Sequence, residues 1–130
     1  ADTYVAGFVG SPTMNFLPGH LVNDGTAVQL AAGPLIPLQG RRSGDAVTLG
    51  IRPEHLTLGG SDLTLTVDLI EPLGSETLLH GRLSDRDADT MTVKVTGAVQ
   101  ATETATVGVQ ADQAHVFDAV TGKRIDPAGN

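Results

Sequence analysis

Apolar and polar residues alternate in short stretches along most of this chain, and the alternation constrains the fold more than any other feature. In residues 63–69 and 91–95, leucine, valine and methionine alternate with threonine, aspartate and lysine. Such alternation buries one face of a β-strand and exposes the other. Sixteen glycines and seven prolines interrupt it, and turn sequences such as residues 23–25 and 59–61 lie between the stretches. Short strands with regular turns predict an all-β fold, either a small barrel or a sandwich.

Two distant segments of the chain resemble each other. Residues 48–56 align with residues 106–116 when two residues are inserted, and both begin with threonine, an aliphatic residue, glycine and an aliphatic residue. Farther upstream, residues 19–21 resemble residues 81–83 in the same way. Such a repeat predicts two similar halves that close a common core. Chance similarity between glycine-rich strands is the alternative explanation.

The N-terminal residues differ from the rest of the chain. Asp2 is suited to cap a helix, Val5, Phe8 and Val9 have helical spacing, and Gly10 can end the helix. A helix of about two turns is too short to be stable alone. We therefore expect residues 1–10 to be the helical tail of a preceding domain and residues 11–130 to form the β domain. A short helix packed on the barrel is the alternative.

The composition argues against several classes of protein. The formal net charge of -7, with one tyrosine, three phenylalanines and no tryptophan, disfavours binding to nucleic acid, which needs clustered cations and aromatic platforms. The absence of cysteine excludes disulfides and thiolate metal sites. No stretch has the length of a membrane-spanning helix, and the N-terminus does not resemble a secretory signal.

Motifs for catalysis or metal binding are also absent from the sequence. Four histidines lie far apart: His20, His55, His80 and His115. No HExxH motif and no phosphate-binding loop of the GxxxxGK[ST] type occur. The aspartates within residues 85–89 lack the glycine and distal glutamate of a calcium-binding loop, so we expect a solvated turn there. We therefore expect no catalytic, cofactor or metal site in this chain.

Several segments resemble, in the same order, one family of transport proteins. Residues 6–17 resemble the junction between the nucleotide-binding and regulatory domains in ATP-binding subunits of maltose-type and glycerol-3-phosphate-type ABC importers. Residues 50–56, Gly-Ile-Arg-Pro-Glu-His-Leu, resemble the signature of the regulatory domain. Residues 67–77 are similar to the strand and loop that follow. Residues 115–118 and 121–122 are similar to the C-terminal strand and turn.

The resemblance implies a fold and a role. The fold would be a small OB-like barrel of the TOBE type, preceded by an ATPase domain that would bind ATP and Mg²⁺ outside this chain. The role would be that of a non-catalytic regulatory and dimerisation domain of an importer for sugars or glycerol 3-phosphate. The implied partners are a second copy of the subunit, permease subunits reached through the ATPase domain, and a cytoplasmic regulator protein. The subunit would lie peripherally on the cytoplasmic side of the inner membrane, and the isolated domain would be soluble.

Two loops are our candidates for the surface through which such a domain acts. The first contains Arg52, Pro53, Glu54 and His55, and the second contains Gly74, Ser75 and Glu76. Both place charge and a constrained backbone at the end of a predicted strand. Loops held by a rigid scaffold are suited to recognition. A plain solvated turn is the alternative for each loop.

A second class of function is a β-barrel domain that senses a small ligand, either an oxyanion or a sugar. An oxyanion site needs backbone N–H groups or cationic side chains, and Arg52 and Lys94 are the candidates here. The negative net charge of the chain disfavours a strong anion site.

Overall fold

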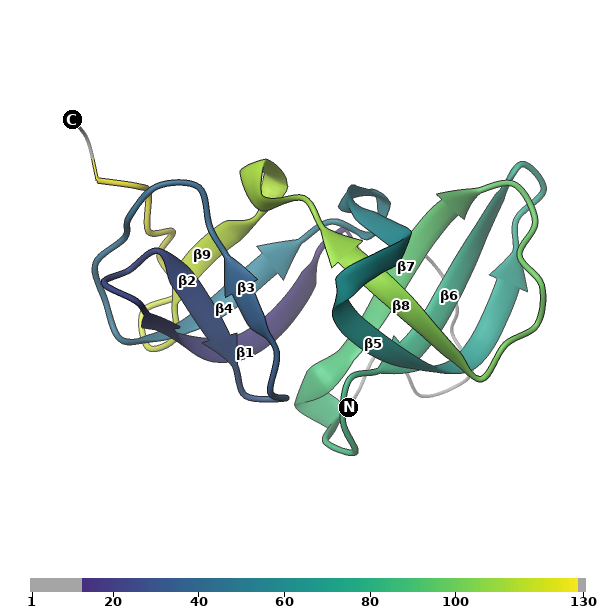
Figure 1. Cartoon of the computed structure of the whole chain (residues 1–130), viewed down its shortest axis with the longest axis horizontal. Coiled ribbons are helices and arrows are strands. Elements are labelled where there is room, and N and C mark those ends of the chain that lie inside the picture. The colour runs from purple at the N-terminus through teal and green to yellow at the C-terminus, as the bar shows by residue number, and fades with distance from the viewer. Residues whose placement is uncertain (1–12, 129–130) are drawn as a thin grey trace.

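Residues 13–128, which the computed structural model describes, form nine β-strands in two curved sheets (Figure 1). Sheet A has the strand order β3-β2-β1-β4-β9, and sheet B has the order β7-β6-β5-β8. The strands of sheet A are β1 (Asn15–Val22), β2 (Ala27–Leu30), β3 (Leu35–Pro37), β4 (Ala46–Ile51) and β9 (His115–Asp118). Those of sheet B are β5 (Leu56–Pro72), β6 (Glu76–Arg82), β7 (Thr90–Thr96) and β8 (Thr104–Val109). The predicted all-β fold is confirmed, whereas the predicted helix of residues 1–10 lies outside the described residues.

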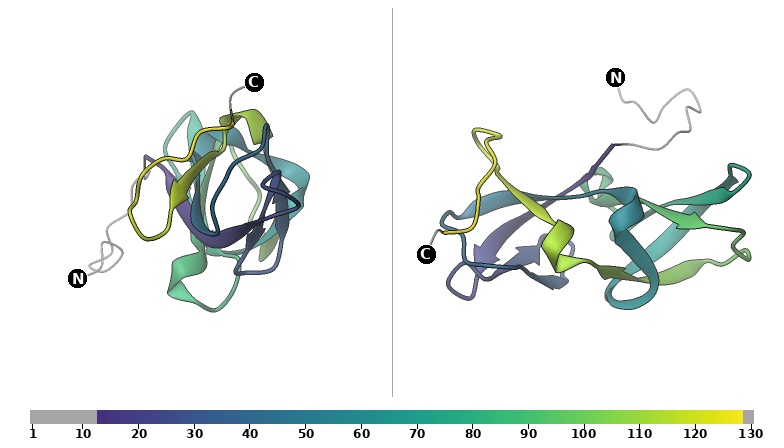
Figure 2. Two further views of the ribbon diagram at one scale, coloured as in Figure 1. Left: turned by 90° about the vertical axis from the view of Figure 1, so that its left-hand side faces the viewer. Right: turned by 90° about the horizontal axis from the view of Figure 1, so that it is seen from above.

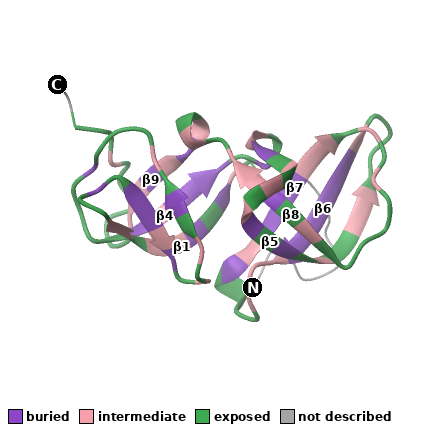
Figure 3. Ribbon diagram, viewed as in Figure 1, coloured by how far each residue is buried: buried purple, intermediate pink, exposed green. Residues whose placement is uncertain are grey.

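The alternating stretches supply much of the core, but the predicted pattern fails at two places: Leu69, after a register shift in β5, is exposed, and the polar Thr92 is buried. In β5, Leu63 and Leu65 are buried. The threonines that alternate with them, Thr64 and Thr66, are exposed. Both sheets contribute to one cluster of buried aliphatic side chains, and the view from above shows the sheets side by side along the long axis (Figure 2). Most buried residues lie on the strands, whereas most of the turns that join the strands are exposed (Figure 3).

The two sheets share one topology. In each, a three-stranded meander is followed by a fourth strand that returns beside the first, giving the orders β3-β2-β1-β4 and β7-β6-β5-β8. The 3₁₀ turn Pro53–His55 then carries the chain from sheet A to sheet B, and the 3₁₀ turn Ala111–Gln113 carries it back. The sequence similarity between residues 48–56 and 106–116 therefore marks the two crossovers.

The other proposed similarity, between residues 19–21 and 81–83, does not follow this topology. Residues 19–21 lie in β1, which corresponds to β5, whereas residues 81–83 begin in β6. That likeness is therefore a coincidence between two glycine-containing strands.

Residues 59–61 do not form the turn between strands that the glycines predict. They lie within the long strand β5, where the register with β8 shifts so that Val107 pairs with both Leu58 and Leu63. The chain passes so close to β8 that a Cβ added to Gly60 would lie 2.3 Å from the Cα of Gly108. Asp62 secures the shift, because its carboxylate accepts a hydrogen bond of 2.8 Å from the backbone N–H of Val109.

Asn15 joins the two sheets at the start of β1. Its side-chain carbonyl accepts a hydrogen bond from the backbone N–H of Thr92, and its side-chain NH₂ donates to the backbone carbonyl of Thr92, both at 2.8 Å. Thr92 belongs to β7, the edge strand of sheet B. The amide of Asn15 thus takes the place of a neighbouring strand, and both residues are buried.

Candidate interaction surfaces

The first candidate loop is the crossover from β4 to β5. Arg52 precedes the 3₁₀ turn with an extended backbone, and the N–H of His55 donates to its carbonyl at 3.0 Å. Pro53 suits the first position of the turn because its φ is fixed and its missing N–H would have no partner. Its ring is buried, whereas Arg52 and Glu54 are exposed. The turn is therefore anchored in the protein and presents two opposite charges to solvent.

The second candidate loop closes the β5–β6 hairpin. Gly74 has a φ of +95°, and the N–H of Leu73 donates to the carbonyl of Glu76 at 2.7 Å. Ser75 is exposed, and its carbonyl accepts a hydrogen bond of 2.8 Å from Gly97. Glu76 lies 3.5 Å from the ammonium group of Lys94. The Glu76 side chain is still 43% exposed, so the pair leaves part of its carboxylate open to solvent.

The structure does not bring the two candidate loops together. The turn Pro53–His55 lies between the sheets, whereas the loop at residues 73–76 lies at the end of sheet B that is remote from sheet A (Figures 1 and 2). Lys94 is on β7 beside the second loop, so it is also remote from Arg52. The residues predicted from sequence therefore belong to two separate surfaces.

A third surface, missed by the sequence reasoning, is the outer face of sheet A. The register places Phe16 of β1 beside Gly50 of β4, and Gly50 beside His115 of β9. Thr48 is likewise paired with Phe117. Residues in register share a face, and the alternate residues of the same strands, Leu17, Leu49 and Val116, are buried in the core.

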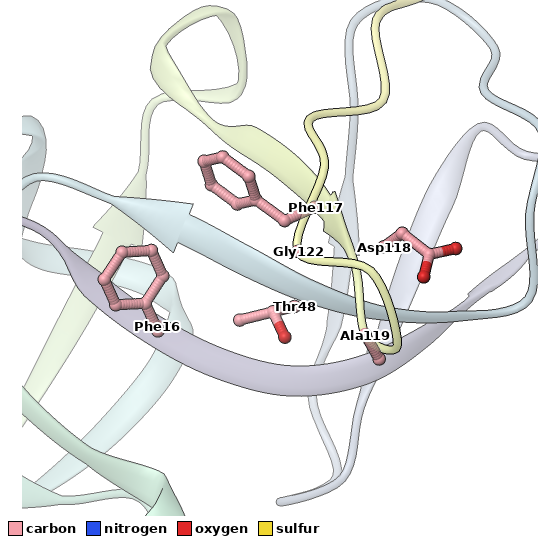
Figure 4. Close-up of a pocket in the computed structure, with 6 residues that line it drawn as sticks. All are labelled: Phe16, Thr48, Phe117, Asp118, Ala119 and Gly122. Carbon is pink, nitrogen blue, oxygen red and sulfur yellow. The ribbon is translucent and has the colours of Figure 1, made fainter.

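Two aromatic rings form a hollow on this outer face. Phe16 and Phe117 meet edge to face, with their ring centroids 5.9 Å apart and their planes at 65°. A hollow of about 460 Å³ lies beside them, and its lining residues are Phe16, Thr48, Phe117, Asp118, Ala119 and Gly122 (Figure 4). Phe16 is 55% exposed. The sequence contains one sign of this surface. Two of the three phenylalanines, Phe16 and Phe117, stand where the alternation of their strands predicts a polar residue.

Charged groups border the hollow on two sides. Burial lowers the pKa of His115, and nearby Arg124, Arg52, His55 and Arg42 lower it further. On the other side, the backbone N–H groups of Thr121 and Val120 hold the pKa of Asp118 below its ordinary value, each donating to its carboxylate at 2.8 Å. Cationic side chains therefore lie on the His115 side of the hollow, and a carboxylate lines its other side.

A buried polar chain crosses sheet B. One ring nitrogen of His80 lies 3.0 Å from a carboxylate oxygen of Glu71, and the other lies 3.0 Å from the hydroxyl of Thr92. The order carboxylate, imidazole, hydroxyl matches that of hydrolase triads. However, Thr92 is 2% exposed and its backbone is held by Asn15, so no substrate can reach the hydroxyl. His80 is thus part of a structural network rather than a surface histidine.

The acidic loop at residues 85–89 is only partly the solvated turn that its composition suggests. Asp89 is 1% exposed. The guanidinium of Arg86 donates to its carboxylate at 2.8 Å, and the hydroxyl of Ser84 also donates to it. Hydrogen bonding within the loop thus satisfies a buried charge. Asp85 lies 3.4 Å from Arg82 and remains exposed.

Within residues 13–128 there is no group of three or more His, Asp or Glu side chains arranged to hold a metal ion. None of the helices in that part of the chain is long and apolar enough to cross a membrane.

Comparison with known proteins places these features in a family. The family model described as MalK OB fold domain matches residues 10–56, and the model described as TOBE domain matches residues 49–117. Together they cover both crossovers and both sheets.

Several relatives are sn-glycerol-3-phosphate import ATP-binding proteins. The chain is 44% identical over 128 residues to the protein of Ruegeria pomeroyi, 42% identical over 135 residues to that of Burkholderia pseudomallei, and 36% identical over 133 residues to that of Escherichia coli. These alignments cover 96%, 95% and 96% of this chain, and 35%, 37% and 36% of the relatives. The chain therefore spans about a third of the length of the curated relatives it matches.

Proposed function

We propose, because this chain belongs to the TOBE domain family, that it is the non-catalytic regulatory domain of the ATP-binding subunit of an ABC importer for glycerol 3-phosphate or a sugar. The observation that carries the proposal is that two family models match consecutive parts of the chain and their overlap falls on the crossover at residues 49–56. The names of the relatives support the importer and its solute. In this proposal, ATP and Mg²⁺ bind to a domain outside these 130 residues.

A β domain without catalytic groups can regulate an ATPase by holding two copies in register. Closed pairs are the commonest oligomers, and each interface of a pair uses the same patch twice. We propose the loops Arg52–His55 and Gly74–Glu76 as the contact surfaces. Their separation across sheet B supports two distinct contacts, for example one with a second copy and one with another subunit. Permease subunits would be contacted through the ATPase domain, on the cytoplasmic side of the membrane.

Charge reversal tests the first contact in the full-length subunit that contains this chain. Glu54→Lys changes an exposed residue of the first crossover, and Asp112→Lys changes an exposed residue at the equivalent position of the second crossover. Both variants alter the net charge equally. We expect sedimentation to show weakened dimerisation for Glu54→Lys and not for Asp112→Lys. Equal sedimentation of both variants and the wild type would remove the first loop from the interface.

The hollow beside Phe16 and Phe117 favours one alternative, a domain that senses a small ligand. Aromatic walls and the hydroxyl of Thr48 suit a sugar, and the cations near His115 suit an oxyanion. Calorimetric titration with maltose, glycerol 3-phosphate and phosphate separates the alternatives. Micromolar affinity for any of them would support the sensor, and its absence is expected for a regulatory domain that acts through protein contacts.

A further inference from the structure

We propose that the outer face of sheet A is a docking surface for an acidic, apolar segment of a partner protein. The face is defined by Phe16, Thr48, Gly50, His115 and Phe117 together with the hollow that they border. It adjoins the first of the loops proposed above at Arg52 and lies apart from the second. The inference adds a site and a chemistry to the regulatory function, on which it rests for its biological role.

The face has the shape and apolarity of an anchor site. Phe16 is 55% exposed, and Val120, on the loop that borders the hollow, is 90% exposed. Gly50 is buried and lets Met14 and Phe117 pack closely on the strand, because a Cβ there would lie 2.6 Å from the sulfur of Met14 and 2.8 Å from a ring carbon of Phe117. Adjacent exposed apolar groups around a hollow are characteristic of protein interaction sites.

A partner would have to dock on the face rather than add a strand to the sheet. The outer edge of β9 is already occupied, because Phe117 forms an isolated bridge with Arg124 and the N–H of Ile125 donates to the carbonyl of Val116 at 2.7 Å. Strand addition needs free backbone groups along an edge. An apolar side chain inserted into the hollow is the remaining mode of binding at this place.

The Arg52 and His115 side of the face favours an acidic partner, whereas the carboxylate of Asp118 lines the hollow on the other side. Arg52 is exposed and has no ion-pair partner within the described part of the chain. The His115 ring, 6.5 Å from the Phe117 ring, lies among cationic groups. Carboxylates of a partner placed beside Arg52 and His115 would complement this field and steer association.

The same charges disfavour a second copy of this chain as the occupant. Pairing about a twofold axis close to Arg52 and His115 would bring these groups of the two copies together, and like charges across an interface are unfavourable. Contact between this face and an acidic region elsewhere on a second copy would not close into a pair and would build a ring or a filament.

Three short, capped synthetic peptides serve as probes for the 130-residue chain. One alternates glutamate with leucine and phenylalanine, the second replaces every glutamate with lysine, and the third replaces every apolar residue with serine. Binding is followed through the amide signals of the labelled chain in two-dimensional NMR. We expect the acidic, apolar peptide to shift the signals of Phe16, Thr48, Gly50, Phe117 and Gly122. We expect binding to weaken as salt is added.

Matched variants locate the binding. Phe16→Ser removes the exposed ring of the face, and Leu35→Ser removes a 44% exposed leucine from β3 of the same sheet. Arg52→Glu reverses a charge on the face, and Arg41→Glu reverses a 62% exposed charge elsewhere. We expect Phe16→Ser and Arg52→Glu each to weaken binding about tenfold or more, as truncated anchors do. Leu35→Ser and Arg41→Glu should have little effect.

The inference is overturned by any of three results. These are no binding by the acidic, apolar peptide, equal binding of the lysine peptide, or equal losses in the variants and their controls. Concentration-dependent shifts of the same signals without peptide would assign the face to a second copy and overturn it as well. None of these results bears on the dimerisation proposal, which depends on Glu54 in the full-length subunit.

Discussion

Replacement of Asn15 by alanine should destabilise the domain more than its one side chain suggests. The change removes both hydrogen bonds to Thr92 and leaves the N–H and the carbonyl of a 2% exposed residue without partners. Each buried, unsatisfied group costs about 1–3 kcal/mol. The expected loss for the two groups is therefore about 2–6 kcal/mol, a large fraction of the roughly 5–15 kcal/mol that stabilises a typical domain.

Gln29→Ala is the matched control, because the Gln29 amide also donates to a backbone carbonyl, that of Gly33, but in an exposed setting. Urea unfolding followed by circular dichroism gives the free energy of unfolding for both variants. We expect a change of at most about 0.5 kcal/mol for Gln29→Ala, since exposed groups can bond to water. A loss for Asn15→Ala as small as that of the control would refute the inference that Asn15 replaces a neighbouring strand of β7.

Three further predictions concern the strand crossing, a titrating group and the nucleotide. Gly60→Ala should cost about 1–3 kcal/mol or more, because its Cβ would meet the backbone of Gly108 at 2.3 Å, whereas Ser61→Ala should be nearly neutral in the same urea assay. The pKa of His115 is lower in the folded protein than in the unfolded chain, so the unfolded chain binds a proton first as the pH falls. The free energy of unfolding should therefore decrease as the pH drops below about 6.5. His115→Gln should reduce this dependence of the free energy of unfolding on pH, and an unchanged dependence would show that another group causes it. Calorimetry should detect no binding of Mg-ATP to the 130-residue chain, and micromolar affinity would contradict the non-catalytic assignment.

The fold was predictable because its main determinants are local. Period-two alternation in residues 63–69 and 91–95 indicates which face of each strand is buried, and the burial of Leu65 and Val93 follows it, whereas Leu69 is exposed and Thr92 is buried against the pattern. The repeat in residues 48–56 and 106–116 predicted two halves, and it coincides with the two crossovers. These signals need no knowledge of distant contacts.

The features that the sequence did not predict depend on long-range contacts. Gly59 and Gly60 have the composition of a turn, and only the presence of Gly108 across the strand explains why they lie within β5. Asn15 and His80 are unremarkable in sequence, since their partners Thr92 and Glu71 are brought near only by the completed sheet.

The candidate surfaces show the same limit. The proline at position 53 and the glycine at position 74 correctly predict constrained turns. The distance between the two loops, however, depends on the path of β5. Phe16 and Phe117 were recognised only as parts of a family pattern. Their meeting requires the register of β1, β4 and β9, which places two exposed rings on one face.

The central claim is that this chain regulates an ATPase without taking part in its chemistry, and coupling in the complete importer tests it most directly. The measurement is the number of solute molecules transported per ATP hydrolysed by the reconstituted importer, with Glu54→Lys and Asp112→Lys compared with wild type. We predict that Glu54→Lys lowers this ratio while the rate of ATP hydrolysis at saturating ATP is retained, and that Asp112→Lys leaves both unchanged. Loss of ATP hydrolysis itself in the Glu54→Lys importer, with normal folding and normal nucleotide affinity, would contradict the claim.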